Sequence, residues 1–314
     1  MEQKQIPASW TPSQLVERYI EEYILRPDTI RNYRIVAHIF EKDMGPLKVS
    51  EIDSNYVLNW RSIILDRVRP ITWNNYRSHL RVLWNFGIRK NWLDTNPFIE
   101  VQPAPVLKKA KKTVSDDLLA ATISLLEDSE KASRLAWFWL IVVKFLYFTG
   151  MRRRQLTSLR WNDIDFRDNT ILLSAEGSKT KREWTIPIPE NCLNDLLRLR
   201  QRTEVVNRKA FDANDQVFRV QLFYKRYVGD ELSPDQLGGF FRHLSMDLNG
   251  YVSSHRLRHT MATQLAKGPN RDLKLLQEIL GHTNMTTTLE YVHPEPEQFR
   301  GFLNQLELPK KNQK

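Results

Sequence analysis

The chain has 314 residues, of which 47 are Lys or Arg and 37 are Asp or Glu, giving a formal net charge of +10. Hydrophobic residues make up 41% of the chain and charged residues 27%, as in ordinary globular proteins, so a disordered chain is excluded. The length predicts about two domains, each large enough to bury a core. The single cysteine, Cys192, excludes a disulfide framework or a multi-thiolate metal site and indicates a reducing compartment.

The apolar patterning does not fit a secreted or membrane protein. The amino terminus lacks the basic start and apolar core of a secretion signal. The longest apolar stretch, Leu135 to Phe148, is interrupted by Lys144 and is shorter than the ~18 residues that a membrane span needs, so it predicts a buried helix. We therefore expect a cytoplasmic protein, and its positive charge favours a polyanionic partner.

Residues 1–101 carry the pattern of four helices without strands. The helices are expected to begin at Thr11–Pro12, at Pro27–Asp28, near Ser50 and near Thr72, because prolines and capping residues are typical of helix starts. Apolar residues recur at helical spacing within each segment, which predicts a small helical bundle. On the second and fourth helices, basic residues are expected to face away from the core, as a binding surface or simply a solvated face: Arg31, Arg34, Arg77 and Arg81.

A basic linker follows at residues 102–112, with the sequence QPAPVLKKAKK. Its prolines forbid a helix at its start. Four lysines lie within five positions: Lys108, Lys109, Lys111 and Lys112. We expect this segment to join the helical domain to a second domain at residues 113–314 and to lie near a polyanion.

The second domain mixes helices with a few short strands. Helices are expected at about 115–127 and 131–148, and a break at Gly150 precedes a short helix at Arg152–Leu159. Between Asp163 and Pro189 the pattern changes to short alternating runs, which predict a small antiparallel sheet with an exposed hairpin tip, GSKTKR. Helices return after the sheet. The fold class is therefore mainly α with a small antiparallel β-sheet.

Two patches in this domain offer positive charge to a phosphate. In TGMRRRQL, Gly150 ends a helix and Arg152 begins the next one, where free backbone N–H groups favour an anion. Three consecutive arginines are also typical of a solvated corner. Lys179 lies at the hairpin tip, where a solvated charge is the alternative unless the tip folds over a bound anion.

A third patch, SSHRLRHT, is expected on a helix capped by one of its serines. His255 and Arg258 are three residues apart and share a face. His255 and His259 are four apart, as in zinc proteases, but Arg256 stands where such a site needs a glutamate, so no metal is expected.

A fourth patch, LGHTNMTTTLEYVHP, contains His282 just beyond a helix and Tyr291 on a short helix. A lone tyrosine is ordinarily half-buried core. Together, however, the four patches supply arginines, a lysine, histidines and a tyrosine, which are the groups needed to attack a phosphodiester without a metal. Arginines neutralise developing charge on the phosphate, a lysine or histidine moves protons, and tyrosine is a nucleophile.

The order and spacing of these motifs resemble the tyrosine recombinases of the phage integrase family. The resemblance rests on TGMRRRQL, on SKT in a hairpin, on HRLRHT and on LGHTNMTTTLEY, with 24 residues from Arg258 to His282 and nine from His282 to Tyr291. It covers essentially the whole chain, because residues 1–101 resemble the family's core-binding domain. No arm-type domain is expected before the bundle, which suits two-domain integrases, resolvases or transposon-encoded recombinases.

The resemblance implies a site-specific recombinase with a covalent intermediate. Tyr291 would attack the scissile phosphate and form a 3′-phosphotyrosine. Arg152 and Arg258 would clamp the phosphate, and His282 would hydrogen-bond one of its oxygens. Religation would need neither ATP nor a cofactor, because the covalent bond preserves the energy of the phosphodiester.

Proton transfer is implied for two further residues. Lys179 would be the general acid for the leaving 5′-oxygen, although Lys181 lies two positions away on the same hairpin tip. His255 would assist proton transfer involving Tyr291. Family members usually carry Glu three residues after the first arginine, where this chain has Gln155; its carbonyl can still orient Arg152.

The implied partner is double-stranded DNA, clamped between the two domains. The arginines of the helical domain and the linker lysines would contact its phosphates. After Tyr291, apolar residues share one helical face and, in the family, such a tail is donated to a neighbouring subunit of a tetramer on two DNA sites: Phe299, Phe302, Leu303 and Leu306. A mobile element, a nucleoid location and accessory DNA-bending proteins fit the same expectation. The alternatives are a non-catalytic DNA-binding protein of this fold and a type IB topoisomerase.

Overall fold

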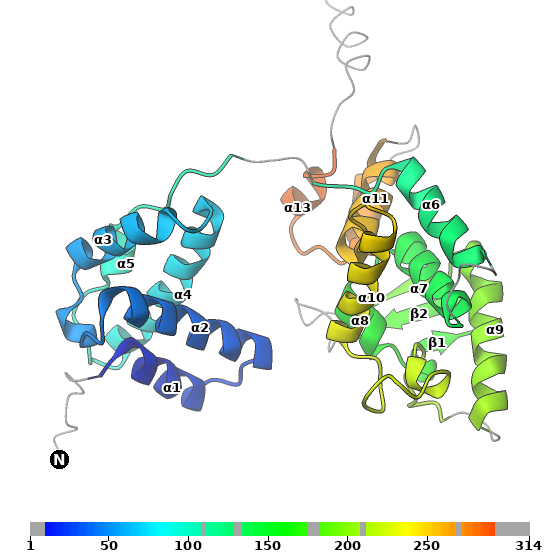
Figure 1. Cartoon of the computed structure of the whole chain (residues 1–314), viewed down its shortest axis with the longest axis horizontal. Helices are drawn as coiled ribbons and strands as arrows, with labels where there is room; N and C mark the ends of the chain where they lie inside the picture. Colours follow the sequence, from blue (N-terminus) through cyan, green and yellow to red (C-terminus); the bar gives the residue numbers. More distant parts are fainter. Residues whose placement is uncertain are drawn as a thin grey trace, which may run out of the picture. The chain divides into compact units, whose positions relative to one another are not determined.

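The computed structural model describes residues 10–107, 111–128, 134–174, 183–207, 212–267 and 272–292. The chain divides into two compact units, Met1–Lys109 and Ala110–Lys314 (Figure 1). Each unit buries its own hydrophobic core. Within the described ranges, no helix is long and apolar enough to cross a membrane.

The first unit is a bundle of helices. They are α1 (Pro12–Glu22), α2 (Pro27–Met44), the 3-10 helix η1 (Val49–Glu51), α3 (Ser54–Leu65), α4 (Pro70–Arg89) and α5 (Pro97–Glu100). Proline occupies the first turn of α1, α2, α4 and α5, where its missing N–H group costs no hydrogen bond. The four predicted helices are all present, and the short α5 follows them. The indole rings of Trp60, Trp73 and Trp84 fill the centre of the bundle.

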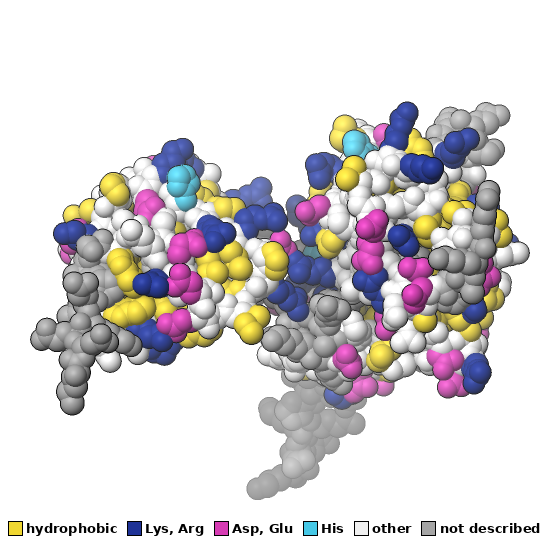
Figure 2. All heavy atoms as spheres, turned by 90° about the horizontal axis from the view of Figure 1, so that it is seen from below, with side chains coloured by type: hydrophobic (Ala, Val, Ile, Leu, Met, Phe, Trp, Pro, Cys, Tyr) yellow, Lys and Arg dark blue, Asp and Glu magenta, His cyan; other side chains and the backbone are white. Residues whose placement is uncertain are grey.

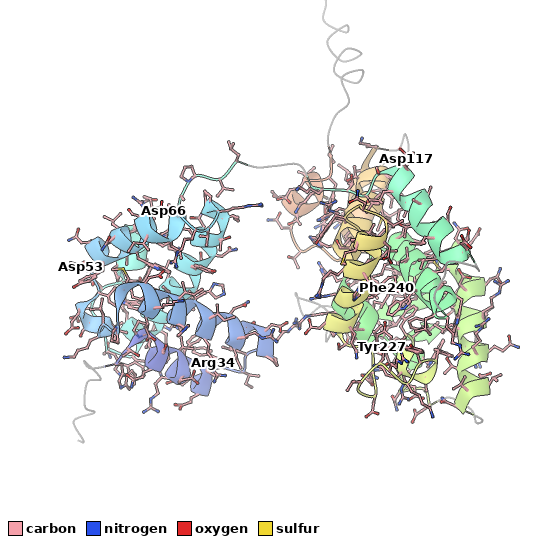
Figure 3. All side chains as sticks on the ribbon, viewed as in Figure 1. Arg34, Asp53, Asp66, Asp117, Tyr227 and Phe240 are labelled. Atoms are coloured by element: carbon pink, nitrogen blue, oxygen red, sulfur yellow. The ribbon has the colours of Figure 1, made fainter. Side chains whose placement is uncertain are left out.

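The arginines of this bundle occupy two different environments. Three of them are exposed: Arg31, Arg34 and Arg81. Arg34, labelled in Figure 3, donates two hydrogen bonds of 2.8 and 2.7 Å to the carboxylate of Glu17 on α1. Figure 2 likewise shows Lys and Arg side chains interspersed with Asp and Glu on the face of the unit that it presents.

Arg77 is a correction, because it does not lie on an outer face. Its side chain is buried, with 7% of the residue exposed, and its Nε donates to the carbonyl oxygen of Val101 at 2.5 Å. Position 77 lies one turn after Trp73 and three residues before Leu80, both fully buried. Residues at these spacings share a helix face, so Arg77 belongs to the inner face of α4.

The second unit combines helices with a three-stranded antiparallel sheet of order β1-β2-β3. Its helices are α6 (Asp116–Glu127), α7 (Ala136–Thr149), α8 (Arg153–Ser158), η2 (Trp161–Asp163), α9 (Glu190–Asn207), η3 (Val220–Leu222), α10 (Pro234–Asp247), α11 (Ser254–Lys267), α12 (Leu273–Leu280) and α13 (Met285–Leu289). The strands are β1 (Ile164–Asp165), β2 (Thr170–Leu173) and β3 (Trp184–Pro187). In the register of β2 and β3, Ile171 pairs with Ile186, and both are buried. The predicted fold class, mainly helical with a small antiparallel sheet, is confirmed.

Helix α7 is the centre of the second unit (Figure 1). It packs against α6, α9 and α11, and it is buried because its sequence is apolar on nearly all sides. It ends at Gly150, whose backbone has a φ of 60°. A Cβ at this position would lie 1.9 Å from Cε of Met261 on α11. Glycine therefore permits both the left-handed turn and the close approach of α11 to the segment that leads into α8.

Candidate active site

Three separate segments of the second unit bring the predicted site residues together. The junction of α7 and α8 supplies Arg152, and the first half of α11 supplies Arg258. The segment that runs from the end of α12 to just beyond α13 supplies His282 and Tyr291. Arg258 connects all three, because its Nη1 donates to the carbonyl oxygen of Gly150 at 2.6 Å and its Nη2 lies 3.1 Å from Nε2 of His282.

Arg258 is a buried cation held mainly by neutral acceptors. Only 3% of the residue is exposed. Besides Gly150 and His282, its Nη2 donates to the carbonyl oxygen of Leu280 at 2.8 Å. Burial, reinforced by the charge of Arg152, lowers the pKa of Arg258 to about 10. No carboxylate in the described ranges forms an ion pair with it, and a buried charge without a counter-ion is costly unless an anion binds there.

Arg152 is a second cation at the same place. It precedes α8, and its backbone N–H donates to Oε1 of Gln155 at 2.9 Å, which caps the helix. Its pKa is lowered by burial. Two buried donors of this turn, Nη1 of Arg152 and Nε2 of Gln155, have no hydrogen-bond partner among the described residues. Because buried donors in proteins are normally paired, these atoms indicate an acceptor ligand.

His282 lies directly after α12, on a turn that requires glycine. Gly281 has a φ of 59°, and a Cβ there would lie 2.4 Å from the indole ring of Trp184. A guanidinium group can only donate, so Nε2 of His282 accepts from Arg258, and Nδ1 carries the proton and donates to Oγ1 of Thr288 at 3.0 Å. Burial, with Arg258 and Arg152 nearby, lowers the pKa of His282 to about 4, so the ring is neutral at pH 7.

Tyr291 follows α13 and is almost completely buried, with 2% of the residue exposed. Its ring lies parallel to the ring of His282, at a centroid distance of 6.1 Å and an interplanar angle of 4°. Its hydroxyl oxygen lies 2.9 Å from Nδ1 of His259. Both Arg152 and Arg258 interact electrostatically with it. The structure thus places a phenol hydroxyl among two guanidinium groups and neutral imidazoles.

His255 lies at the edge of this group. It is exposed, and its ring centroid lies 4.0 Å from that of His259, one helical turn further along α11. Partial desolvation of the ring by its neighbours on α11, together with the charges of Arg258 and Lys111, lowers its pKa. The hydrogen bond to the hydroxyl of Tyr291 is made by His259 instead. The sequence pattern assigns His259 only to a metal pair that lacks its glutamate. The signal that points to a role in this site is its place directly after Arg258 on the same helix.

Three predicted features, the hairpin tip, the basic linker and the tail, lie partly or wholly outside the described residues. The residues not described are Lys179 and Lys181 at the hairpin tip, Lys108 and Lys109 of the linker, and the tail after Val292. Lys111 is described, and its Nζ forms an ion pair of 2.8 Å with the carboxylate of Glu290, the residue before Tyr291. Lys112 is exposed.

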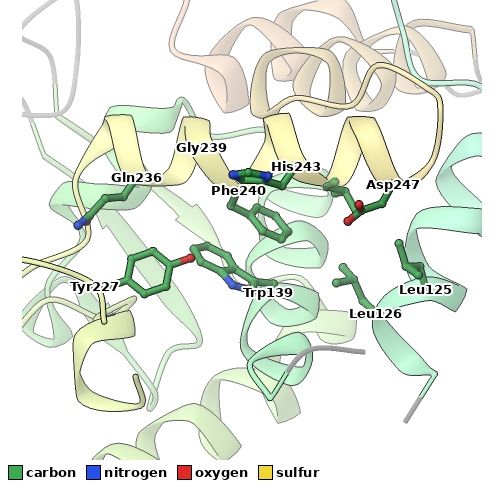
Figure 4. Close-up of a pocket in the computed structure, with 10 residues that line it drawn as sticks. Leu125, Leu126, Trp139, Tyr227, Gln236, Gly239, Phe240, His243 and Asp247 are labelled. Atoms are coloured by element: carbon green, nitrogen blue, oxygen red, sulfur yellow. The ribbon is translucent and has the colours of Figure 1, made fainter. Parts of the chain in front are cut away.

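A separate pocket of the second unit shares no lining residue with this group (Figure 4). Its volume is about 470 Å³. The ring of Trp139 on α7 stacks on that of Phe240 on α10 at a centroid distance of 4.1 Å, and Tyr227 adds a third aromatic ring. The remaining lining residues come from α6 and α10: Leu125, Leu126, Gln236, Gly239, His243, Leu244 and Asp247.

Known proteins resemble this chain in both sequence and fold. A Pseudomonas aeruginosa protein assigned as a tyrosine recombinase XerC is 32% identical over 308 residues, covering 94% of this chain and 71% of that protein. A Pseudomonas syringae protein assigned in the same way is 30% identical over 94% of this chain, which spans 64% of that relative. Among solved structures, the Tn1549 transposon integrase in complex with a circular intermediate DNA has a TM-score of 0.74 at 21% identity, over 95% of this chain and 100% of that one.

The lambda integrase, solved as a tetramer bound to a Holliday junction, has a TM-score of 0.66 at 17% identity, over 89% of this chain and 76% of that one. These two structural likenesses establish the fold. The sequence profile of the phage integrase family matches residues 115–298, which include all three segments of the site. The chain therefore belongs to the phage integrase family of tyrosine recombinases.

Proposed function

We propose that this protein is a site-specific DNA recombinase in which Tyr291 cuts and rejoins DNA strands. The observation that carries the proposal is the buried hydroxyl of Tyr291, which shares one site with Arg152 and Arg258. Nη1 of Arg152 and Nε2 of Gln155, which find no partner among the residues that the structure describes, border the same site. A phosphodiester supplies the missing negative charge and acceptor atoms, and the phenol supplies the nucleophile.

The proposed reaction gives each of these residues a role and adds Lys179, which the family resemblance implies. The hydroxyl oxygen of Tyr291 forms a bond to the scissile phosphorus and gives up its proton to water with the help of His255, while the bond from phosphorus to the 5′-oxygen breaks. The guanidinium groups of Arg152 and Arg258 neutralise charge on the non-bridging oxygens, and His282 hydrogen-bonds one of them. Lys179 gives a proton to the leaving 5′-oxygen. Attack by a 5′-hydroxyl reverses each of these changes and rejoins the strand, to the original or to a new partner.

To donate a hydrogen bond to a phosphate oxygen, His282 must carry a proton on Nε2. Its Nδ1 donates to Thr288 and its Nε2 accepts from Arg258. The negative charge of a bound phosphate raises the pKa of a neighbouring imidazole, so a protonated His282 could donate from Nε2 once Arg258 turns to the phosphate. His255, exposed beside the site, is proposed to exchange protons between the site and water.

DNA binding is proposed to involve both units of the chain. The basic residues Arg31, Arg34 and Arg81 are exposed on the helical unit, and the linker of residues 102–112 is rich in lysine. Such residues contact phosphates and set the register on DNA without reading its sequence. Residues 1–101 are thus the proposed core-binding domain and residues 113–314 the proposed catalytic domain.

Assembly into a tetramer on two DNA sites is the form proposed for strand exchange. The lambda integrase is described as a tetramer on a Holliday junction, and the same fold in this chain supports that arrangement here. The tail after Tyr291 would then link neighbouring subunits. Action in the nucleoid, on a mobile element and with accessory DNA-bending proteins, belongs to the same proposal.

The decisive experiment traps the covalent intermediate. Duplexes that the protein selects from a random-sequence pool define its site. A nick a few nucleotides beyond the scissile phosphate then makes the fragment that carries the free 5′-hydroxyl so short that it diffuses away after cleavage. Wild type should form a denaturation-resistant protein–DNA adduct, and Tyr291→Phe should form none. An adduct in Tyr291→Phe would place the nucleophile elsewhere, and no adduct with wild type would leave a non-catalytic DNA-binding protein. Relaxation of supercoiled plasmids that lack the site would indicate a topoisomerase.

A further inference from the structure

One buried contact of the site has no role in the reaction as proposed above. Nδ1 of His259 lies 2.9 Å from the hydroxyl oxygen of Tyr291. The two residues are 5% and 2% exposed, so water does not compete freely for this bond. The ring of His259 is itself held between the ring of His255 at 4.0 Å and that of Tyr291 at 5.4 Å.

We propose that His259 is a positioning residue, which accepts the hydrogen bond of the Tyr291 hydroxyl on Nδ1 and so aims the nucleophile at the phosphate. This inference rests on the proposed function of Tyr291. It differs from the role proposed for His255, which lies in water and exchanges protons with it.

The direction of the hydrogen bond follows from the charges around it. Burial, together with His255, Lys111 and Arg258, lowers the pKa of His259 to about 3, so the ring is neutral and has one acceptor nitrogen. Guanidinium groups can only donate, and the two that interact with Tyr291 favour a hydroxyl that turns its oxygen toward them and its proton away. With Nδ1 as the acceptor of its proton, the phenolic oxygen presents its lone pairs to the two guanidinium groups, which are the groups proposed to bind the phosphate.

The place of His259 in the chain explains how it fixes the geometry. It directly follows Arg258 on α11, so the turn of helix that binds the phosphate also holds the nucleophile. Tyr291 lies 32 positions further along the chain, in a segment joined to α13 by a hydrogen bond of 3.1 Å from its N–H to the carbonyl oxygen of Thr288. Without His259, this short segment, ring packing and the two guanidinium groups would still act on Tyr291, but none of them accepts the proton of its hydroxyl.

The test compares two amides that differ in where they place their acceptor. His259→Asn carries its side-chain oxygen near the position of Nδ1, whereas His259→Gln carries it near the position of Nε2. On the nicked duplex, His259→Asn should form the covalent adduct within about threefold of the wild-type rate, and His259→Gln and His259→Leu should be slowed ~10²-fold, the cost of a misplaced reactant. Binding of the intact duplex should stay within about twofold in all three, because no phosphate contact is removed.

A second substrate distinguishes a role of His259 at the nucleophile from a role at the leaving group. A 5′-bridging phosphorothiolate releases a thiolate, which needs no proton from a general acid. The slowing of His259→Gln should persist on this substrate, because a misdirected nucleophile is not repaired by a better leaving group. Restoration of its rate by the thiolate would assign His259 to the leaving group and overturn the inference.

Two further outcomes would also overturn it: a wild-type rate in His259→Leu, or a His259→Asn variant as slow as His259→Leu. If thermal melting shows that His259→Leu does not fold, the comparison of Asn with Gln decides alone. Wild type and Tyr291→Phe are run beside the variants. No adduct with wild type overturns the proposed function and this inference with it, whereas a wild-type adduct with indifferent His259 variants overturns the inference alone.

Discussion

Arg34 and Arg258 show how differently two arginines of one chain are used. Arg34 is exposed on α2 and bonds through both ends of its guanidinium to the carboxylate of Glu17. Arg258 is buried on α11 and bonds to two carbonyl oxygens and a neutral imidazole. The first charge is balanced by a carboxylate, whereas the second has no carboxylate partner in the part of the chain that the structure describes. Net charge therefore gives little information about function until each cation is assigned its counter-ion.

The same contrast explains what the buried site gains from an anion. Two cations share a site of low water content, and desolvation lowers the pKa of both Arg152 and Arg258. An exposed ion pair such as that of Arg34 is screened by water and salt. In the buried site, by contrast, an entering phosphate meets fixed donors with little water between them, which strengthens each interaction.

The largest expected effect comes from removing a half-buried cation that has few bonds within the protein. Arg152→Ala should slow covalent adduct formation ~10³-fold or more, the usual effect of losing a guanidinium at a transferring phosphoryl group. Its thermal stability should change little, because Nη1 of Arg152 has no hydrogen-bond partner among the described residues. The adduct assay and a melting curve measure the two quantities on the same sample.

The neighbouring Arg153→Ala is the matched control. Arg153 carries the same side chain one position later but is exposed, so its loss should leave the rate of adduct formation nearly unchanged. Equal slowing by both substitutions would mean that positive charge near α8, rather than the buried guanidinium, supports the reaction, and the contrast between buried and surface arginines would fail.

Acidification should lower the thermal stability of the free protein, because protonation of the histidines adds positive charge to a site that already holds two arginines. The pKa values of His282 and His259 are lowered to about 4 and about 3, so the unfolded chain takes up protons at higher pH than the folded one. The resulting stability is fully present above about pH 6.5, the ordinary pKa of histidine, and is lost as the pH falls toward 4. The Tm of the free protein should therefore fall between pH 7 and pH 4.5.

His282→Asn provides the comparison for the titration. It removes one of the two imidazoles, so its Tm should be lower at pH 7, where the bond to Arg258 is lost, but should fall less steeply with acidity. Parallel curves for wild type and variant would show that carboxylates elsewhere cause the acid sensitivity.

The sequence was sufficient for the parts of this molecule that depend on local signals. Prolines marked the starts of several helices, the apolar run at Leu135–Phe148 predicted the buried α7, and alternating residues predicted the sheet. Ordered motifs predicted the family, because their residue types and spacings are rarely combined by chance. The convergence of Arg152, Arg258, His282 and Tyr291 in one site was expected only through the resemblance, and the fold supplies it through α11.

Other features depended on contacts that no local pattern contains. Arginine is typical of protein surfaces, but Arg77 lies one turn after the buried Trp73. Its side chain donates to the carbonyl oxygen of Val101, which directly follows α5. His259 was assigned no role because its partner, Tyr291, lies 32 residues away. In both cases the environment of the side chain depends on a partner that is distant in the sequence. Helical spacing predicts only which residues share a face of the helix.

A stability measurement on the helical unit tests the correction at Arg77. Arg77→Ala removes the donor that satisfies the carbonyl oxygen of Val101 and should lower the free energy of unfolding by about 1–3 kcal/mol. Arg81→Ala, on the exposed side of the same helix, should change it by no more than about 0.5 kcal/mol. Urea unfolding measures both, and equal values would mean that the bond of Arg77 contributes nothing.

The smallest effect should come from Arg34. Whether its removal changes the salt dependence of DNA binding decides whether this surface arginine of the bundle contacts DNA. If Arg34 contacts a phosphate, Arg34→Ala reduces the slope of log affinity against log salt by about one unit. Glu17→Gln then strengthens binding at low salt, because it frees the guanidinium from its carboxylate. If Arg34 serves only Glu17, both substitutions leave the slope as it is. The second result would mean that an arginine paired with a carboxylate of the protein, such as Arg34, does not contact DNA. The difference between Arg34 and Arg258 would then also separate the arginines of the bundle that bind DNA from those that do not.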